Sequence, residues 1–259
     1  MIKILHRFFY AWLFLTKLPA PPLPKAKNED WGRIAPYFTL IGFILGFILY
    51  FFSKVLISYK IPFMFSALLV LLTWILITGG LHMDGLMDTF DGINCQDKNR
   101  KLEAMKDSRI GAFGAMGGIF IILFKLVTLC TILVNKLFFV LIIALALSRL
   151  LVVYSFTVLS KNKDSGASSS LLLSGIKKPD DFLVNLIFFL IISFLFIAFA
   201  HLKFYYCFFI LISFFLCLFW TYWLNNHFKG HTGDTFGALV ELSEVTILSL
   251  GVILKNYLL

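Results

Sequence analysis

Long apolar runs separated by polar segments dominate the hydrophobic pattern of the chain. Several runs reach the roughly 20 residues that an α-helix needs to cross the hydrocarbon core of a bilayer. The pattern predicts membrane-spanning helices near residues 34–58, 61–80, 113–134, 136–158, 182–200, 203–224 and 236–254. Glu241 and Glu244 interrupt the last run and weaken it. We therefore expect an all-α, polytopic membrane bundle of about 6–7 transmembrane helices, with residues 1–259 forming one domain.

Composition supports a membrane protein and excludes an ordinary soluble domain. The 259 residues are 60% hydrophobic and 14% charged, with a mean hydropathy of +0.91. Soluble domains carry roughly 25% charged residues, so this chain lacks the polar surface to face water. The chain leaves no room for a separate soluble domain, and any active site must lie in the bundle or its connections.

The net charge of +9 is explained by membrane topology without a nucleic-acid partner. Lysine and arginine concentrate in residues 1–33, 81–112 and 159–181, which alternate with very short connections. Such residues favour cytoplasmic segments, so these three segments and residues 225–235 are predicted to face the cytoplasm. The four cysteines are scattered and form no CxxC pair, which indicates neither a zinc site nor a disulfide framework.

The N-terminal segment, residues 1–33, has two possible interpretations. Its basic start and apolar stretch resemble a signal peptide, but Lys17 interrupts that stretch and no clear small-x-small cleavage site follows. Basic residues interleaved with Phe8, Phe9 and Trp12 favour an amphipathic helix at the membrane interface.

The stretch TGGLHMDGLMDTFDG, residues 78–92, follows an apolar run and contains His82 and three aspartates. If the stretch is helical, Asp84, Asp88 and Asp91 lie at i, i+4 and i+7, within roughly 60° of one another around the axis. Three carboxylates this close to a membrane repel one another strongly. A hard divalent cation such as Mg²⁺ would remove the repulsion. The alternative is a solvated, glycine-rich turn with scattered acids.

A second polar stretch, KDSRIGAFGAMGG, occupies residues 106–118. Its candidate residues precede or open the third predicted span: Asp107, Ser108, Arg109, Gly111 and Gly114. Glycines at a helix N-terminus let backbone N–H groups approach a phosphate, and an arginine offers a bidentate fork to its oxygens. The alternative is helix packing through small residues, because Gly114 and Gly118 form a GxxxG pattern.

The third stretch, NNHFKGHTGDTFGALVELSE, occupies residues 225–244. Its candidate residues lead into and enter the last predicted span: His231, Thr232, Asp234, Glu241 and Glu244. Acids within a span are functional candidates. The two glutamates either help hold a second metal or form ion pairs with Lys125, Arg149 or Arg109. Under the predicted topology all three stretches meet on one side, and together they suit phosphoryl transfer.

Four stretches resemble the cobalamin synthase family, the adenosylcobinamide-GDP ribazoletransferases. They are FLTKLPAP (14–21), TGGLHMDGLMDTFDG (78–92), MKDSRIGAFG (105–114) and GHTGDTFGALVELSE (230–244), and their order and spacing also fit. The chain departs from the family at VLSKNKDSGASSS, where an arginine-containing stretch is usual. Lys161 or Lys163 is the candidate for that cationic role.

The resemblance implies a Mg²⁺-dependent enzyme that joins adenosylcobinamide-GDP to α-ribazole or its 5′-phosphate. GMP leaves, and adenosylcobalamin or its phosphate forms. It also implies a multi-pass protein of a bacterial or archaeal cell membrane (the inner membrane in a Gram-negative cell), with a cytoplasm-facing site. A homo-oligomer remains open.

We hypothesise that Asp84, Asp88 and Asp91 hold the metal. The catalytic candidates are these three with Asp107, Arg109 and Asp234. The substrate-binding candidates are His82, Ser108, Gly111, Gly114, His231, Thr232 and Glu241.

Two other functions are compatible with parts of the pattern. The CDP-alcohol phosphatidyltransferases also place a DG-rich aspartate cluster beside a cytoplasmic helix end, but this chain has LM at 86–87 where their AR dipeptide stands. A divalent-cation transporter needs polar groups strung through the depth of the membrane, whereas the acids here gather mainly at one face.

Overall fold

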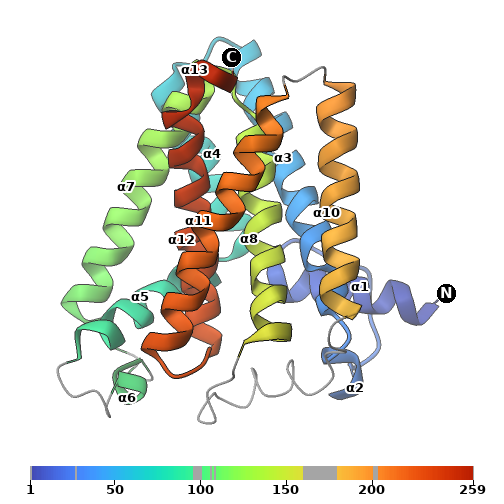
Figure 1. Cartoon of the computed structure of the whole chain (residues 1–259), viewed down its shortest axis with the longest axis vertical. Helices are drawn as coiled ribbons and strands as arrows, with labels where there is room; N and C mark the ends of the chain where they lie inside the picture. Colours follow the sequence, from blue (N-terminus) through green and yellow to red (C-terminus); the bar gives the residue numbers. More distant parts are fainter. Residues whose placement is uncertain are drawn as a thin grey trace.

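A computed structural model describes residues 2–26, 28–95, 101–105, 107, 109–159, 180–200 and 204–258. Its described part is helical throughout, without strands (Figure 1). Six helices there are long and apolar enough to cross a membrane, and a bent helix pair counts as a seventh. The six are α3 (Phe38–Ser58, preceded by the short η1, Ala35–Tyr37), α7 (Ala112–Val134), α8 (Phe139–Val158), α10 (Asp180–Phe199), α11 (Tyr205–His227) and α12 (Gly233–Ile253).

The seven predicted spans all coincide with helices, and the second one differs most from its prediction. The helix α4 covers only Phe63–Thr78 and ends at a pair of glycines. Gly79 and Gly80 both have φ of +68°, a conformation that side-chain-bearing residues rarely adopt. They turn the chain by 88° into α5 (Leu81–Asn94). The helix α5 therefore runs across one end of the bundle instead of extending α4 (Figure 1).

The first polar segment, predicted as a loop over residues 81–112, is thus mostly helical where the structure describes it. It holds α5 and the short α6 (Lys101–Met105). The predicted loop at 225–235 is also shorter, because α11 extends to His227 and α12 begins at Gly233. Nearly all of the predicted loop at 159–181, including Lys161 and Lys163, lies outside the described residues.

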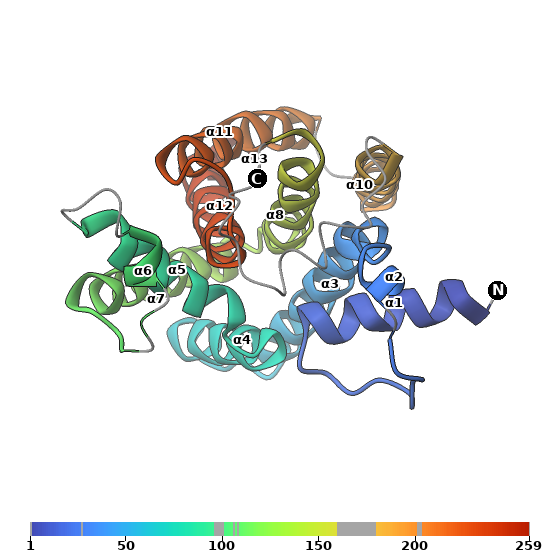
Figure 2. The same cartoon turned by 90° about the horizontal axis from the view of Figure 1, so that it is seen from below.

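The N-terminal segment packs against the same end of the bundle. The helix α1 (Ile2–Leu15) crosses α3 and buries Tyr10, Ala11 and Leu15, and the short α2 (Asn28–Trp31) lies beside it. Figure 2 shows α1 at the edge of the bundle, beside α2 and α3. The backbone N–H of Lys17 donates to the carbonyl of Ile77, at 2.8 Å, in the last turn of α4. The segment is thereby tied to the start of the predicted aspartate motif.

The helix α8 forms the centre of the bundle. Nearly all of its side chains are buried, and α3, α10, α11 and α12 pack around it (Figure 2). The C-terminal helix α13 (Lys255–Leu258) lies at the end of the bundle opposite α5 (Figure 1).

Four charged side chains meet inside the bundle. Lys125 on α7 lies 2.7 Å from a carboxylate oxygen of Glu241 and 2.6 Å from one of Glu244, both on α12. Arg149 on α8 pairs with the other oxygen of Glu244. Lys125 also lies 4.4 Å from the centre of the Trp74 ring, within range of a cation–π interaction. The ion-pair alternative for the two glutamates is confirmed, with Lys125 and Arg149 as partners.

Glu244 bridges both cations of this cluster, whereas Glu241 pairs with one. Removing one partner of a buried ion pair leaves an uncompensated charge and costs about 3–5 kcal/mol. We expect Glu244→Gln to lower the thermal unfolding temperature in detergent more than the matched Glu241→Gln, one turn away on the same helix. An equal or larger loss in Glu241→Gln would contradict a central role for Glu244.

Candidate active site at one end of the bundle

The site is built on a contact between α5 and α12 that only glycine permits. A Cβ atom at Gly85 would lie 2.8 Å from the carbonyl oxygen of Asp234 and 2.9 Å from its Cα. A Cβ at Gly237 would lie 2.9 Å from the carbonyl oxygen of His82. Real Cβ atoms essentially never come this close to backbone, so the two helices touch at their backbones.

This contact places three carboxyl groups near enough for their charges to interact: Asp84 and Asp88 on α5, and Asp234 in the first turn of α12. Burial raises the pKa of Asp88 to about 7, and the neighbouring charges of Asp84, Asp234 and Asp91 add to the effect. No salt bridge within the described part of the chain joins Asp84, Asp88 or Asp234 to a cation. The cluster is therefore an uncompensated negative patch.

Asp91, the third residue of the predicted metal stripe, faces a different helix. Its two carboxylate oxygens accept hydrogen bonds from the backbone N–H groups of Gly111 and Gly114, both at 2.8 Å. These groups belong to the N-terminus of α7, where the first N–H groups of a helix lack partners within the helix. Asp91 therefore caps α7, while Asp84 and Asp88 lie toward α12.

The same hydrogen bonds change the interpretation of the predicted phosphate cradle. The N–H groups of Gly111 and Gly114 already have an acceptor in Asp91. A Cβ at either glycine would collide with the Asp91 carboxylate. These two glycines admit the cap from α5, and the structure gives no sign of a phosphate cradle there.

Arg109 and Asp107 form a local pair beside the start of α7. The guanidinium donates to both Asp107 oxygens, from Nε at 3.1 Å and from Nη2 at 2.8 Å. Hydrogen bonding to Arg109 lowers the pKa of Asp107 to about 2. The Arg109 side chain is 87% exposed, and no described contact joins it to Asp84, Asp88 or Asp234. Ser108, the residue between them, lies outside the described residues.

The histidine and threonine before α12 are used within the protein. His231 places its two ring nitrogens 3.2 Å from the Thr235 hydroxyl and 3.2 Å from the Thr221 carbonyl oxygen. Thr232 is the N-cap of α12, and its hydroxyl accepts from the N–H of Thr235 at 3.3 Å. Glu241, also predicted to bind substrate, is 5% exposed and pairs with Lys125. His231 and Thr232 stabilise the start of α12, and Glu241 anchors the helix further along. All three are buried and offer little surface to a ligand.

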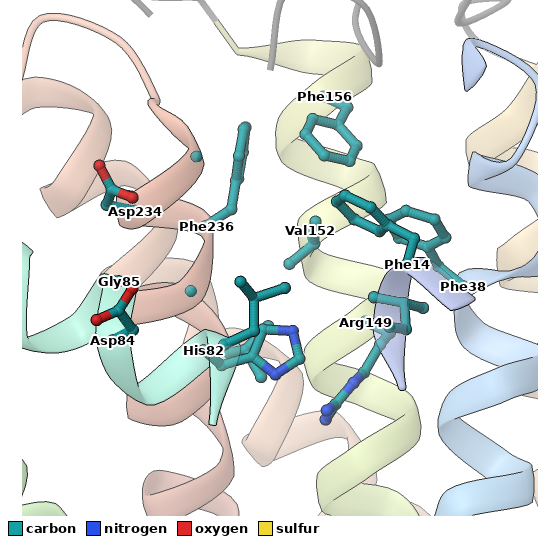
Figure 3. A pocket seen from close by; sticks show the side chains of 15 residues that line it. Phe14, Phe38, His82, Asp84, Gly85, Arg149, Val152, Phe156, Asp234 and Phe236 are labelled. Carbon is teal, nitrogen blue, oxygen red and sulfur yellow. The ribbon is translucent and has the colours of Figure 1, made fainter. Parts of the chain in front are cut away.

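A pocket opens between α5, α8 and α12 (Figure 3). It has a cavity volume of about 200 Å³. Asp84 and Asp234 lie on one side of it, and His82 and Arg149 line its wall. The remaining lining is mainly aromatic and aliphatic: Phe14, Leu15, Phe38, Leu81, Val152, Phe156, Phe236 and Val240. The sequence did not predict this pocket, although many of its lining residues belong to the resemblance motifs at 14–21, 78–92 and 230–244.

Carboxylate oxygens are suitable ligands for a divalent cation, but the described residues do not form a complete coordination site. Among the described residues, no three histidine, cysteine, aspartate or glutamate side chains already converge as a metal site. Asp84, Asp88 and Asp234 nevertheless offer uncompensated oxygen ligands of the kind that Mg²⁺ prefers. Mg²⁺ commonly takes one or two carboxylates and completes its shell with water and substrate phosphates.

Comparison with known proteins assigns the chain to a family. The family profile described as Cobalamin-5-phosphate synthase matches residues 7–252. The chain belongs to this family. The resemblance drawn from the four sequence stretches is thus confirmed for the cobalamin-5-phosphate synthase family.

Three curated relatives span nearly the whole chain, and all are named adenosylcobinamide-GDP ribazoletransferase. The protein of Thermoanaerobacter pseudethanolicus is 32% identical over 94% of this chain and 96% of its own length. That of Thermosynechococcus vestitus is 32% identical over 96% of each chain. That of Clostridium botulinum (strain Okra) is 33% identical over 96% of this chain and 98% of its own. No solved structure gives a significant match.

The family stretches converge in space where the structure describes them. Lys17 bonds to the end of α4, Gly85 touches Asp234, and Asp91 caps α7. Segments far apart in the sequence thus meet at one end of the bundle, which is the candidate active site of this family member.

The capping role of Asp91 is separable from metal binding. Removing an N-cap acceptor costs about 0.5–2 kcal/mol. We expect Asp91→Ala to lower the unfolding temperature of the metal-free protein in detergent, because two N–H groups of α7 lose their acceptor. The matched Asp84→Ala, on the same helix, should not lower it. If both variants unfold at the wild-type temperature without metal, the Asp91 cap does not contribute measurably to stability.

Proposed function

We propose that the protein transfers the phosphocobinamide part of adenosylcobinamide-GDP to α-ribazole or its 5′-phosphate, late in cobalamin biosynthesis. The family match over residues 7–252 and the common name of the relatives carry this proposal. The carboxylate cluster at the end of the bundle supports it, because phosphoryl transfer depends on positioning and on charge neutralisation.

The proposed reaction exchanges one P–O bond for another. A ribose hydroxyl oxygen of α-ribazole bonds to the phosphorus attached to cobinamide, the bond from that phosphorus to GMP breaks, and GMP leaves. The hydroxyl proton must pass to a base. Asp234 suits this role because it lines the pocket and has no cationic partner in the described part of the chain. Asp107 suits it poorly, since its pKa of about 2 makes it a weak base.

We further propose that Mg²⁺ is held by Asp84 and Asp88, with Asp234 adjacent. When bound, the cation neutralises charge on the diphosphate and on the leaving GMP. Asp91 is better assigned to positioning, since both of its oxygens serve α7. Arg109, exposed and oriented by Asp107, remains the candidate that offsets charge on the transferring group.

We propose that the site faces the cytoplasm of a bacterial or archaeal cell, because the described basic residues of the N-terminal segment, with Lys101 and Arg109, lie at that end, as the positive-inside rule favours. The C-terminus lies at the opposite end of the bundle (Figure 1). Alkaline phosphatase fused to the C-terminus should therefore be active, because it folds only outside the cytoplasm. An inactive fusion with normal expression would invert the orientation.

The reaction is tested directly with purified protein in detergent. Adenosylcobinamide-GDP, α-ribazole and Mg²⁺ should yield GMP and cobalamin in equal amounts, resolved by chromatography. Asp88→Asn should reduce turnover by about 100-fold or more, as expected when a group that stabilises transition-state charge is lost. The control is Asp180→Asn, an exposed carboxyl at the start of α10. Turnover of a CDP-activated lipid alone, or near-normal activity in Asp88→Asn, would oppose the proposal.

The raised pKa of Asp88 gives a pH dependence of stability. The pKa rises from 3.8 to about 7 on folding, so the folded protein holds a proton that the unfolded chain releases in this window. Stability of the metal-free protein should therefore fall as pH rises from about 4 to 7. In EDTA, we expect Asp88→Asn to raise the melting temperature at pH 8 and to have little effect at pH 4.

Adding Mg²⁺ at pH 8 should then stabilise the wild type more than Asp88→Asn. Equal Mg²⁺ shifts in the two proteins would remove Asp88 from the proposed metal site.

A further inference from the structure

The pocket beside Asp84 and Asp234 has a continuous aromatic wall. Phe14 stacks on Phe38 with ring centres 5.9 Å apart, Phe38 meets Phe156 edge-on at 6.1 Å, and Phe156 meets Phe236 at 4.3 Å. These rings come from α1, α3, α8 and α12, so four separate segments contribute to one surface. Such a wall favours a flat aromatic ligand, because aromatic rings gain from stacked and edge-to-face contacts beyond the area they bury.

Polar side chains without hydrogen-bond partners lie at the far end of the pocket. His82 is 7% exposed and makes no hydrogen bond to another described residue. Nε and Nη2 of Arg149 are also buried without an acceptor. Figure 3 shows the His82 ring beside the Arg149 side chain, away from Phe156 and Phe236. The two Arg149 nitrogens are thus buried polar groups that need an explanation, whereas the His82 ring lines the open pocket and can pair with a ligand.

We propose that this pocket receives the base of the nucleoside acceptor, with His82 donating a hydrogen bond to its unsubstituted ring nitrogen. This inference rests on the proposed function, in which the acceptor is α-ribazole, whose base is a dimethylbenzimidazole. The base is flat and apolar except for that one nitrogen, which matches an apolar pocket with a polar end. Its ribose would then lie toward Asp84 and Asp234, where the transfer is proposed.

Size and polarity argue against the other parts of the two substrates. The cavity of about 200 Å³ is smaller than the roughly 300–1,000 Å³ of pockets for drug-sized ligands, so a corrin does not fit. A guanine base presents several donors and acceptors around its rim, and most of them would face phenylalanine, leucine or valine here. Their burial without partners would be unfavourable.

Filling the pocket tests the assignment. Val152 lines it from α8 and is 5% exposed, whereas Val158 on the same helix is 55% exposed and outside it. We expect Val152→Phe to raise KM for α-ribazole by about tenfold or more, equivalent to about 1.4 kcal/mol. KM for adenosylcobinamide-GDP should stay within about twofold of the wild-type value, and Val158→Phe should change neither constant. A rise in both constants, or in neither, would overturn the inference.

The His82 contact is tested with a ligand that lacks the acceptor nitrogen. Wild-type protein should bind α-ribazole more tightly than the matching riboside with an indole base, measured by equilibrium dialysis in detergent. His82→Phe should bind both equally weakly, because only the hydrogen bond distinguishes the two bases. A variant that keeps the wild-type preference would overturn the role of His82.

Binding and turnover separate the two levels of proposal. If the wild-type protein binds α-ribazole and Val152→Phe does not, yet the wild type releases no GMP, the proposed reaction would be opposed and the pocket supported. Wild-type protein that forms cobalamin, with KM for α-ribazole unchanged in Val152→Phe, would support the reaction and overturn the pocket. If Val152→Phe does not fold, dialysis with wild type and His82→Phe decides.

Discussion

The backbone contact between α5 and α12 is the constraint on which the candidate site depends. Gly85 and Gly237 let the two helices touch, and a side chain at either position would push them apart. The contact fixes Asp84 and Asp88 beside Asp234 and sets one wall of the aromatic pocket. Burial first, and then repulsion between the neighbouring carboxylates, raises the pKa of Asp88 to about 7. A fold that accepts such repulsion without a protein cation is suited to a site where a cation and phosphates meet.

Other interactions hold the two helices in this position. The 88° turn at Gly79 and Gly80 aims α5 across the bundle end, and Asp91 ties α5 to the start of α7. On the other side, Glu241 and Glu244 anchor α12 to α7 and α8 through Lys125 and Arg149. The site is therefore held by polar interactions on both sides of the glycine contact, and α7 takes part in both.

The spans were predictable from the sequence because hydropathy over about 20 residues directly reflects the thickness of the bilayer. The helical spacing of Asp84, Asp88 and Asp91 was also predictable, but the direction of each side chain was not. Asp91 faces α7 because the 88° turn brings its side of α5 to the start of that helix, and this depends on tertiary packing. His231 likewise has partners at Thr221 and Thr235, which only the fold brings to it. The pocket is lined by residues of five helices, α1, α3, α5, α8 and α12, and no local sequence pattern combines them.

Charged side chains in the middle of the bundle are paired, whereas the carboxylates of the candidate site have no cationic partner in the described part of the chain. In mid-bundle, Lys125 and Arg149 are matched by Glu241 and Glu244. This cluster therefore has no net charge in a region where unpaired ions are very costly. At the end of the bundle, Asp84, Asp88 and Asp234 have no such match in the described part of the chain. Water, ions and charged substrates reach only the end of a bundle, so uncompensated carboxylates are tolerable there and nowhere deeper. The apolar pocket lies beside Asp84 and Asp234 at this end of the bundle, so under the proposed function a base would leave water there while its ribose stays beside the reacting diphosphate.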